Sequence, residues 1–529
     1  MSYESDLLQR YLKKGENNWE DIFKRVAKFL ANNNEEYDKF FNLMNNNDFY
    51  PNTPLLLNAG TSMPMASACF AFAMHDSMDS ILQTFKEAAR TQYLGGGTGI
   101  SFDKLRHSGA PIKKGTRGNA MGVVNTIRGF DGWFKSILQG GLRRSASMGV
   151  INCDHPEIFE FIKCKDKEGE IATFNISVGI TDRFMKAVEN EEDWDLIDRK
   201  TKKAHKTIKA KEIWDLLCQQ AYKNGEPGLL FLDTINKLHP LPEKIVNTNP
   251  CGEAILSNNE SCILGSINLV NHVLFDDQGR AKGLDLEKLK STVREAVVLL
   301  NKVIDKQMYP LKKIERKVKK TRKIGLGLMG FATVCCLLDI EYGSKKCYDF
   351  IDEFMSMIKK EAYKKSKELV QVYGSIAKLN RANTLLLSIA PTGSISRIAN
   401  IRGKLGCSFG IEPYYAEEYK SNILDGSYSE KIKILSYEYL KKSCLIFAND
   451  LTYKQHIKVQ ARFQNYVDHS ISKTINLPFE ATMEDVSKAF VMAYRHDCKG
   501  ITVYRSGSRK NEVLEQKKHE GCVTGSCEL

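Results

Sequence analysis

The sequence lacks a long apolar segment. The apolar run at residues 324–338 carries three glycines and is shorter than the roughly 18 apolar residues that a membrane-spanning helix needs. The N-terminus, MSYESDLLQRYLKKGENNWED, is charged where a signal peptide would have an apolar core. We therefore expect no transmembrane span, no membrane partner and no secretion signal.

The sequence also lacks a disulfide framework. Its 14 cysteines are neither dense nor evenly spaced, unlike those of small secreted proteins that depend on disulfides. The two cysteines near the C-terminus are not accompanied by a second Cys or His pair at the spacing of a zinc site. We predict free thiols, no metal site and a reducing, cytoplasmic setting.

A nucleic-acid recognition motif is absent as well. The net charge is +13, from 77 basic and 64 acidic residues, and lysines are spread over helical stretches such as KKIERKVKKTRK. No basic stripe is interleaved with aromatic residues, as it is in nucleic-acid readers. This pattern is typical of a solvated, lysine-rich surface that attracts small anionic ligands, so we expect no nucleic-acid partner.

What the sequence does contain is an alternation of two kinds of segment. Short apolar or β-branched runs, typical of buried strands, occur at 53–57, 172–180, 383–390 and 501–505. Long amphipathic segments lie near 78–94, 211–224, 284–306, 344–373 and 483–497. This alternation predicts an α/β fold and, because no Pro- or Ser-rich linker interrupts it, a single large barrel-like domain.

The two ends of the chain differ from this middle. Residues 19–47 have apolar positions at helical spacing, and the residues after Arg509 have too little apolar content to pack. We therefore predict a short helical segment at 1–50, the main domain at 51–510 and a flexible redox-active tail at 511–529.

One short stretch has the composition of a catalytic loop. In NTNPCGEAIL, Cys251 stands between Pro250 and Gly252, and Asn249 and Glu253 share its face if the stretch is extended. A carboxylate can exchange a proton, and an amide can hold a hydroxyl. We interpret the stretch as a loop that presents a thiol to a substrate. Cysteines in helical apolar surroundings are interpreted instead as small hydrophobic residues, and these are Cys218, Cys335, Cys336 and Cys347.

Two further cysteines, Cys522 and Cys527, lie near the end of the chain with four residues between them. Thiols at this spacing can close a small disulfide ring, and a flexible arm can carry them between a buried site and an external reductant. Two incidental solvent-exposed thiols, or half of a metal site, are the alternatives that the residues leave open.

These features belong to a longer series of motifs. The series is NTPLLLNAGT (52–61), SACF (67–70), GGGTGISFDKLR (95–106), GGLRRSASMG (140–149), NPCGE (249–253), SCILGSINL (261–269), GLGLMG (325–330), APTGSIS (390–396), GIEP (410–413), KGITVYR (499–505) and the final CVTGSC. In this order the motifs resemble the catalytic subunit of ribonucleotide reductase, in its class II, adenosylcobalamin-dependent branch. The resemblance runs from about residue 50 to the end of the chain.

The resemblance implies a ten-stranded α/β barrel of two five-stranded halves, with a central finger loop that carries Cys251. It implies reduction of ribonucleotides to 2′-deoxyribonucleotides, in which Cys251 becomes a thiyl radical and takes the hydrogen from C3′ of the substrate. Glu253 would take the proton of the 3′-hydroxyl, and Asn249 would hydrogen-bond the sugar hydroxyls. Because the S–H bond is similar in strength to the C–H bond, this hydrogen transfer is reversible.

Two dithiols follow from the same resemblance. Cys69 and Cys262 match the pair that supplies a proton to the leaving 2′-hydroxyl and two electrons to the sugar, and that finishes as a disulfide. Cys522 and Cys527 match the tail pair that reduces this disulfide by thiol exchange. A thioredoxin- or glutaredoxin-like protein is the expected reductant.

Substrate binding also maps by motif. Alone, APTGSIS could be an ordinary strand-to-helix turn with a serine cap, and GGGTG could be a tight turn. The resemblance implies that the ribonucleotide binds at both, with a phosphate cradle at 391–396. The matching positions are Thr53, Ser67, Ala68, Gly97, Pro391, Thr392, Gly393, Ser394, Ile395 and Ser396. The choice between a diphosphate and a triphosphate stays open.

Allosteric control is implied in the same way. DSMDSI resembles the segment that holds the base and ribose of a dNTP or ATP effector, at Asp79, Ser80 and Ile81. Arg106 and the loop after it resemble the effector phosphate site, although the basic residues of this loop could equally form a solvated turn. Arg143 or its neighbour matches the loop that passes the effector's identity to the substrate.

The source of the radical is the main alternative. Class I members receive it from a partner subunit through two adjacent tyrosines, whereas residues 502–505 read TVYR at the matching place. This departure favours adenosylcobalamin bound over Cys251 and disfavours a class I-type subunit that needs a radical-generating partner. The tyrosine pair at 414–415 is interpreted as packing.

Three expectations remain. A nucleotide-binding or thiol-exchange protein without radical chemistry is a third hypothesis, which the complete set of cysteines disfavours. Cys69 lies so near the N-terminus that the family's ATP-binding activity domain does not fit, so we expect no dATP shut-off through it. Helices at 78–94 and around 130 could form a homodimer face, but they could equally be self-contained.

Overall fold

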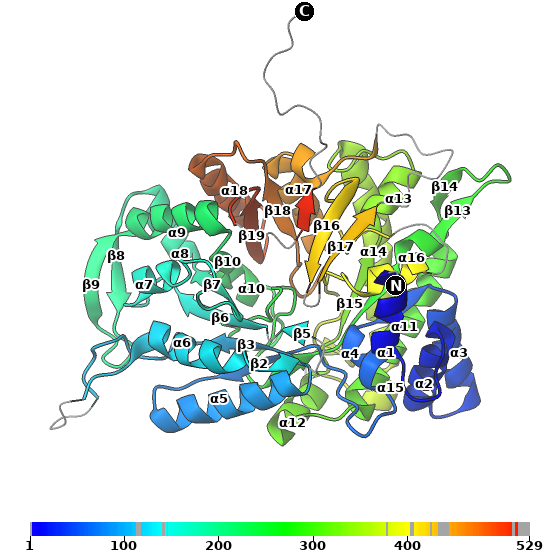
Figure 1. The fold of residues 1–529 in the computed structure, drawn as a ribbon, viewed down its shortest axis with the longest axis horizontal. Coiled ribbons are helices and arrows are strands. Elements are labelled where there is room, and N and C mark those ends of the chain that lie inside the picture. The colour runs from blue at the N-terminus through cyan, green and yellow to red at the C-terminus, as the bar shows by residue number, and fades with distance from the viewer. Residues whose placement is uncertain are drawn as a thin grey trace, which may run out of the picture.

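The computed structural model describes residues 3–112, 118–139, 143–144, 146–376, 379–401, 407–423, 426–431, 444–509 and 514–516. The first three helices are α1 (Tyr3–Tyr11), α2 (Trp19–Leu30) and α3 (Asn34–Asn45), and α2 and α3 pack on the long helix α11 (Leu286–Lys306) (Figure 1). Asn18 and Asn33 cap α2 and α3 by accepting backbone hydrogen bonds. The helical prediction for residues 19–47 is confirmed.

An eight-stranded sheet forms the larger half of the molecule. Its order is β11 (Glu260–Cys262), β2 (Cys69–Ala73), β3 (Gly97–Ser101), β6 (Ser147–Asn152), β7 (Phe174–Ile180), β10 (Gly228–Phe231), β19 (Gly500–Arg505) and β18 (Thr474–Leu477). The five strands from β2 to β10 are parallel, and the flanking strands β11 and β19 run antiparallel to them.

A second sheet lies beside the first. It has the order β1 (Phe49–Pro51), β12 (Leu264–Asn268) and β15 (Gly325–Met329), with β12 and β15 parallel. Isolated parallel bridges join Leu326 to Leu387 and Ile389 to Ile471, so the pairing continues from β15 toward β18. The α/β prediction is confirmed. The central strands of the described residues form these two sheets and not one closed ring, because 383–390 pairs through single bridges. The ten-stranded barrel is therefore not confirmed.

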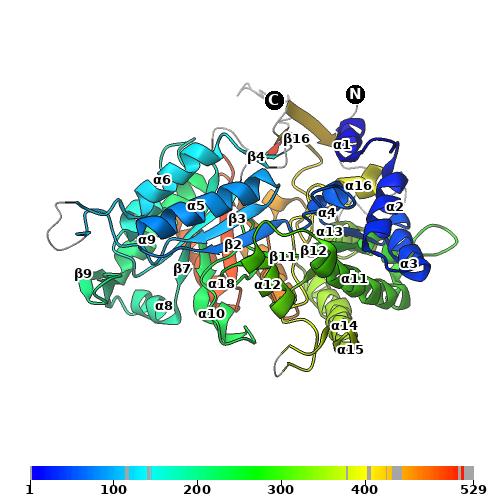
Figure 2. The same cartoon turned by 90° about the horizontal axis from the view of Figure 1, so that it is seen from below.

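Helices cover the outside of both sheets. Figure 2 shows α5 (Met78–Tyr93) and α6 (Gly122–Phe134) side by side, and α5 packs on β2 and β3. The predicted amphipathic segments are α5, α9 (Ala210–Asn224), α11, α14 (Lys345–Glu368) with α15 (Val370–Tyr373), and α18 (Met483–Arg495). Their apolar faces supply the core between helices and sheets.

The remaining elements connect this frame. They are β4 (Leu138–Gln139), β5 (Arg143–Arg144), α7 (Ile158–Lys163), α8 (Asp182–Glu189), β8 (Asp193–Ile197), β9 (Ala204–Lys209), α10 (Leu232–Lys237), β13 (Val273–Phe275), β14 (Ala281–Leu284), α12 (Lys312–Thr321), α13 (Phe331–Leu337), α16 (Ile395–Ile401), β16 (Glu418–Ile423), β17 (Gly426–Lys431), α17 (Tyr453–Gln464) and β20 (Leu514–Gln516), with 3-10 turns at Leu269–His272 and Ala448–Asp450. In the described ranges, no helix is both long enough and apolar enough to cross a bilayer.

One expected strand is a helix. The run TPLLL lies in α4 (Thr53–Asn58). The side chain of Asn52 accepts a hydrogen bond from the backbone N–H of Leu55 at 3.2 Å, and Pro54 stands in the first turn. An N-cap and a proline in the first turn are strong helix-start signals, and here they outweigh the apolar composition.

Candidate active site

The stretch around Cys251 is a hairpin-like finger loop, residues 248–255. Thr248 and Ile255 pair as an antiparallel bridge at its base. At the tip, the Gly252 N–H donates to the Asn249 carbonyl at 3.0 Å, and Gly252 has a φ of +81°. The tip is therefore a tight turn and not the extended stretch considered from the sequence, and it leaves Cys251 exposed.

Two glycines of β3 form the floor on which this loop rests. A Cβ atom added at Gly99 would lie 1.9 Å from the Thr248 carbonyl oxygen, and one added at Gly97 would lie 3.1 Å from Cγ of Pro250. Asn175 of β7 donates to the Pro250 carbonyl at 2.9 Å. The GGGTG motif thus allows a close approach of loop and strand, which neither the turn nor the ligand interpretation anticipated.

Asn249 ties the two legs of the loop to the sheet. Its Oδ1 accepts the Ala254 N–H at 2.9 Å, and its Nδ2 lies 3.4 Å from the sulfur of Cys69 on β2. The side chain is fully buried. Its amide therefore lies between the finger loop and the first thiol of the predicted substrate-reducing pair.

Glu253 is a buried carboxylate directly behind the tip. It is 2% exposed, and its Oε2 has no hydrogen-bond partner in the described part of the chain. Burial raises the pKa of Glu253 to about 7, against the opposing effect of a bond from Asn249. A carboxyl group with this pKa can give or take a proton near neutral pH.

Cys69 and Cys262 face each other across neighbouring strands. They are direct partners in the antiparallel pairing of β2 with β11, and both are buried. A hydrogen bond to Cys262, together with burial, raises the pKa of the Cys69 thiol. Among the described cysteines none forms a disulfide. The two thiols are thus placed side by side, as the resemblance implies.

A cavity of about 520 Å³ opens over the other side of the tip. The described residues that line it include Pro250, Cys251, Gly252, Pro391, Gly393, Glu412, Tyr414, Tyr415, Lys473 and Tyr504. Asn249, Glu253 and the Cys69–Cys262 pair are not part of this lining. Cys251 is therefore the predicted catalytic side chain that reaches the cavity, while the other four lie behind it.

The cavity also contains groups that the sequence did not single out. Lys473 donates to the Glu412 carboxylate at 2.7 Å, and its amine lies 3.0 Å from Nδ1 of His456. Burial lowers the pKa of Lys473, while Glu412 raises it. Tyr414 and Tyr415 line the cavity, which the packing interpretation missed. The GIEP motif before them was the available signal.

The predicted phosphate cradle is only partly open to this cavity. Pro391 and Gly393 line it. Thr392, at a φ of +56°, places its hydroxyl 2.8 Å from the Ser396 hydroxyl and accepts the Gly410 N–H at 2.7 Å. Ile395 begins α16, and Ser394 precedes it. The segment forms a turn held by its own hydroxyl groups.

The other predicted substrate residues lie at different places. The Ser67 hydroxyl is 2.9 Å from that of Ser261, the residue before Cys262, and the Ala68 carbonyl accepts the Gly97 N–H at 2.7 Å. Both flank the buried thiols. Thr53 instead accepts a hydrogen bond from Tyr11 at 3.2 Å.

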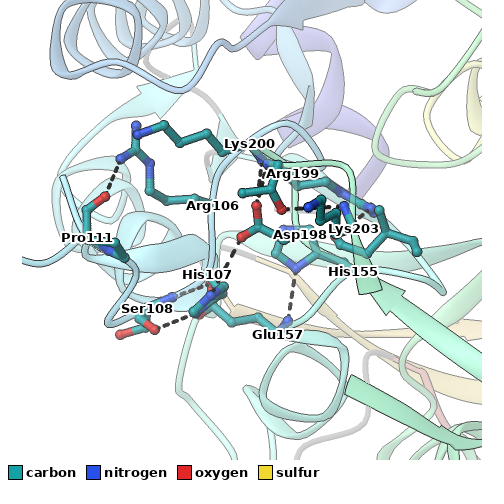
Figure 3. A network of polar contacts seen from close by, with 12 residues as sticks. Arg106, His107, Ser108, Pro111, His155, Glu157, Asp198, Arg199, Lys200 and Lys203 are labelled. Atoms are coloured by element: carbon teal, nitrogen blue, oxygen red, sulfur yellow. Dashed lines mark hydrogen bonds and ion pairs between the residues drawn. The ribbon is translucent and has the colours of Figure 1, made fainter. Parts of the chain in front are cut away.

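The predicted effector residues gather at the start of α5. Asp79, Ser80 and Ile81 lie in its first turn, which Ser77 caps. Arg106 pairs with Asp76 at 2.6 Å and donates to the Pro111 carbonyl at 2.8 Å (Figure 3). Arg106 therefore shapes the loop that follows it. Arg143 lies in β5, where it pairs with Gln139, and its side chain lies outside the described part, as do residues 113–117, Cys522 and Cys527.

Figure 3 shows how this loop is attached to the body of the protein. The Glu157 carboxylate accepts the Ser108 N–H at 3.1 Å and the Val123 N–H of α6 at 2.6 Å. Nε2 of His107 lies 3.9 Å from the Asp198 carboxylate, at the end of β8. The loop is thus joined to α6 and to the hairpin of β8 and β9.

Comparisons with known proteins agree with the motif series. A family model described as "Ribonucleotide reductase, barrel domain" matches residues 67–384 and 374–504, and one described as "Ribonucleotide reductase, all-alpha domain" matches residues 4–64. A protein of Thermoplasma acidophilum named "Vitamin B12-dependent ribonucleoside-diphosphate reductase" is 39% identical over 91% of this chain and 67% of its own length.

Two further relatives mark the range of similarity. A protein of the same name from Mycobacterium tuberculosis is 34% identical over 96% of this chain and 80% of its own length. A "Ribonucleoside-diphosphate reductase subunit alpha" from Chlamydia trachomatis is 28% identical over 72% of this chain and 39% of its own length. Family models and relatives together cover most of the sequence, and the chain belongs to the ribonucleotide reductase family.

Proposed function

We propose that the chain reduces ribonucleotides to 2′-deoxyribonucleotides with adenosylcobalamin as cofactor. The observation that carries this proposal is the position of Cys251, at the exposed tip of a loop with Asn249, Glu253 and a buried dithiol behind it. Relatives over 91% and 96% of the chain are named vitamin B12-dependent reductases. Family membership and geometry therefore support the same chemistry.

The roles of the finger-loop residues follow from their chemistry. As a thiyl radical, Cys251 takes the hydrogen atom from C3′ of the ribose and returns it at the end of the cycle. Glu253 takes the 3′-hydroxyl proton, for which its pKa of about 7 suits it. Asn249 holds the sugar hydroxyls through its amide. These roles extend the family resemblance to the residues at the matching positions.

Cys69 and Cys262 supply the reducing equivalents. Two thiols give up two electrons and two protons as their S–S bond forms, and the 2′-hydroxyl leaves as water after it gains a proton. Cys522 and Cys527 then reduce this disulfide by exchange, and a thioredoxin- or glutaredoxin-like protein reduces them in turn. The side-by-side placement of Cys69 and Cys262 on β2 and β11 supports the first step.

The cavity over Cys251 is large enough for the adenosyl end of the cofactor and too small for the whole of adenosylcobalamin. Its volume of about 520 Å³ adjoins the exposed thiol, and three tyrosines with threonine and asparagine side chains line it. Adenosylcobalamin supplies radical chemistry when it is bound. Tyr414, Tyr415 and Tyr504 would hold it by apolar contact, while the Lys473–Glu412 pair keeps the cavity wall in place.

A class I-type subunit is disfavoured by the end of β19. Tyr504 lines the cavity, but its neighbour is Arg505, which donates to the Phe479 carbonyl at 2.9 Å and lies over the Tyr222 ring at 4.4 Å. Arginine cannot carry a radical as a second tyrosine could. The adjacent tyrosine pair of partner-dependent members is therefore broken at this place.

We further propose a diphosphate substrate, because the relatives named above are called diphosphate reductases. Its phosphates would bind at 391–396, and its sugar would bind near Ser67, Ala68 and Gly97. Thr53 would support the wall of this substrate site. A dNTP or ATP effector would bind at Asp79, Ser80, Ile81 and Arg106, with Arg143 in the loop that reads it. The attachment of the Arg106 loop to α6 supports this arrangement.

A homodimer through α5 and α6 is part of the proposal. Met78, Leu82 and Tyr93 on α5 are 55%, 57% and 71% exposed, and Trp133 on α6 is 66% exposed. Exposed large apolar side chains on adjacent helices are typical of a protein interface.

We also propose that the two sheets are the halves of the family's barrel, that the domain limits are 1–50, 51–510 and 511–529, and that the protein works in the cytoplasm.

The test is deoxynucleotide formation by the purified chain with a dNTP effector and dithiothreitol. Ribonucleoside diphosphates and triphosphates are each offered with and without adenosylcobalamin. We expect product from the diphosphates that requires the cofactor. Absence of product with both substrates, despite measured cobalamin binding, contradicts the proposal, and activity that requires an added protein partner and no cobalamin supports the class I alternative.

A further inference from the structure

A buried polar cluster contacts the finger loop at its C-terminal end, Ile255. The cluster consists of His469, Lys323 and Glu260, which are each at most 2% exposed. None of them lines the cavity over Cys251, and the chemistry proposed above does not use them. Their contacts nevertheless converge on the loop that carries Cys251.

The cluster holds a single residue by both of its backbone groups. Nδ1 of His469 accepts the Ile255 N–H at 3.1 Å. The Lys323 amine donates to the Ile255 carbonyl at 3.3 Å. Ile255 is also the base of the finger loop, where it pairs with Thr248. A side-chain grip on both groups fixes the position and the tilt of this peptide segment.

Further hydrogen bonds and an ion pair hold the cluster itself in place. Lys323 pairs with Glu260 at 2.6 Å, and Glu260 also accepts the Ser257 N–H at 2.6 Å. The backbone of His469 donates to the Leu387 carbonyl at 2.9 Å, and its carbonyl accepts from Lys499 at 3.0 Å. The cluster therefore anchors the loop to strand-like segments on both sides.

The geometry fixes the protonation of the imidazole. A backbone N–H can only donate, so Nδ1 of His469 carries no hydrogen and the ring is the neutral Nε2–H tautomer. Burial first, and then the positive charge of Lys323 and Lys499, lower the pKa of His469 well below its ordinary value. The acceptor on which Ile255 depends is thus kept available at neutral pH.

The grip is close to the reacting groups. Glu253 is two residues before Ile255, and its carbonyl accepts the N–H of Ser470, the residue next to His469, at 2.9 Å. Cys251 lies two residues before Glu253 in the same loop. Because hydrogen transfer requires reacting atoms to be placed to within a fraction of an ångström, support of this kind has a direct effect on rate.

We propose that His469 is a positioning residue for the reaction, which together with Lys323 holds Ile255 and thereby sets the place of Glu253 and Cys251. This proposal rests on the proposed function for its effect on rate. Its structural half, the immobilisation of the loop, does not depend on activity.

Three substitutions at His469 test it. His469→Asn keeps an acceptor near the position of Nδ1, His469→Gln is of similar size but carries its amide beyond that position, and His469→Leu removes the acceptor. The matched control is His239→Leu, since His239 is also a buried imidazole that faces Lys323, while its Nδ1 lies against the Leu241 carbonyl at 3.0 Å and not the finger loop.

The measurements are kcat and KM for deoxynucleotide formation with adenosylcobalamin and dithiothreitol, and amide hydrogen exchange over residues 249–257. We expect His469→Gln and His469→Leu to lower kcat by about 10²-fold with little change in KM, and to speed exchange at Ile255. His469→Asn should recover at least about tenfold of the lost rate, and His239→Leu should match the wild type.

Equal kcat and equal Ile255 exchange in all four variants would overturn the proposal. So would His469→Asn and His469→Gln with the same loss, because the acceptor would then be irrelevant. If the wild type itself forms no product, the proposed function fails while the exchange data still decide whether His469 holds the loop. If His469→Leu does not fold, the Asn and Gln variants carry the comparison alone.

Discussion

The two faces of the finger loop differ in what they leave open. The inner face is closed, with Asn249, Glu253, Cys69 and Cys262 buried and linked by hydrogen bonds. The outer face opens into a cavity of about 520 Å³ lined by tyrosines. Cys251 lies at the boundary, exposed to the cavity and two residues from Glu253.

The difference indicates a division of labour. Proton and electron transfer need groups with controlled pKa values, and burial supplies that control on the inner face. A radical generator needs room and an exposed thiol, and these occur on the outer face. Substitutions on the inner face should therefore abolish reduction and spare cobalamin binding, whereas substitutions on the outer face should weaken cobalamin binding and leave kcat at saturating cofactor nearly unchanged.

The largest effect is expected from the buried dithiol. Cys262→Ser removes one of the two electron donors, and we expect deoxynucleotide formation to fall by at least about 10³-fold. Cobalamin binding, followed by the absorbance of the bound cofactor, should match the wild type because Cys262 does not line the cavity. Loss of cobalamin binding in this variant would break the division between the faces.

Glu253→Gln should reduce kcat by about 10²- to 10⁴-fold, the usual contribution of a general base. For the wild type, kcat/KM should rise with pH up to about 7 and then level off, because the carboxylate is the active form. The Gln variant should lack this rise, and a retained rise would assign the ionisation to another group.

The same carboxyl group makes folding stability fall with pH, whereas it makes kcat/KM rise. Burial raises its folded-state pKa to about 7, above the ordinary value of a glutamate in an unfolded chain, so its stabilising contribution is present below the unfolded pKa and is lost as pH rises through about 7. Glu253→Gln should thus have a higher unfolding temperature than the wild type above pH 7, measured by calorimetry. The reverse order would show that Glu253 is charged and well solvated.

A smaller effect is expected on the outer face. Tyr415→Ala should raise the dissociation constant for cobalamin by about tenfold, equal to about 1.4 kcal/mol, through lost aromatic contact. At saturating cofactor, kcat should stay close to that of the wild type. The control is Val372→Ala, which is 69% exposed and does not line the cavity. A fall in kcat with unchanged affinity would place Tyr415 in the chemistry.

The last comparison tests the floor that separates the faces. Gly99→Ala puts a Cβ where the Thr248 carbonyl lies, and overpacking of this kind costs about 1–3 kcal/mol of folding free energy. The loop should shift, and denaturant unfolding and kcat should both register it. Gly129→Ala on α6, where a Cβ meets nothing within 4 Å, is the control. Equal free energies of unfolding for the two variants would show that the finger loop moves to accommodate the added Cβ without cost.

The sequence predicted the parts of this site that motifs carry. Amphipathic spacing located α5, α9, α11 and α18 within a few residues. The family resemblance predicted Cys69 and Cys262 as a redox pair, and the structure has them opposite each other on β2 and β11. Composition alone failed at TPLLL, where a cap and a proline start a helix, and at 383–390, where single bridges replace a strand.

Other features depend on contacts between distant segments. His469 reaches Ile255 across 214 positions of sequence, and Lys473 meets Glu412 across 61. A buried lysine or histidine in a lysine-rich chain gives no local signal of its partner. The turn at Asn249 to Gly252 was also missed, because period-two alternation and a tight turn both put Asn249 and Glu253 near each other.

The most direct test of the account compares the wild type with Cys251→Ala in one experiment. Both proteins are given a ribonucleoside diphosphate, a dNTP, dithiothreitol and adenosylcobalamin, and product and bound cofactor are measured together. We expect cobalamin-dependent deoxynucleotide from the wild type, and a variant that binds the cofactor but forms no product. Product from Cys251→Ala at the wild-type rate would contradict the role of Cys251 as the thiol that joins the two faces.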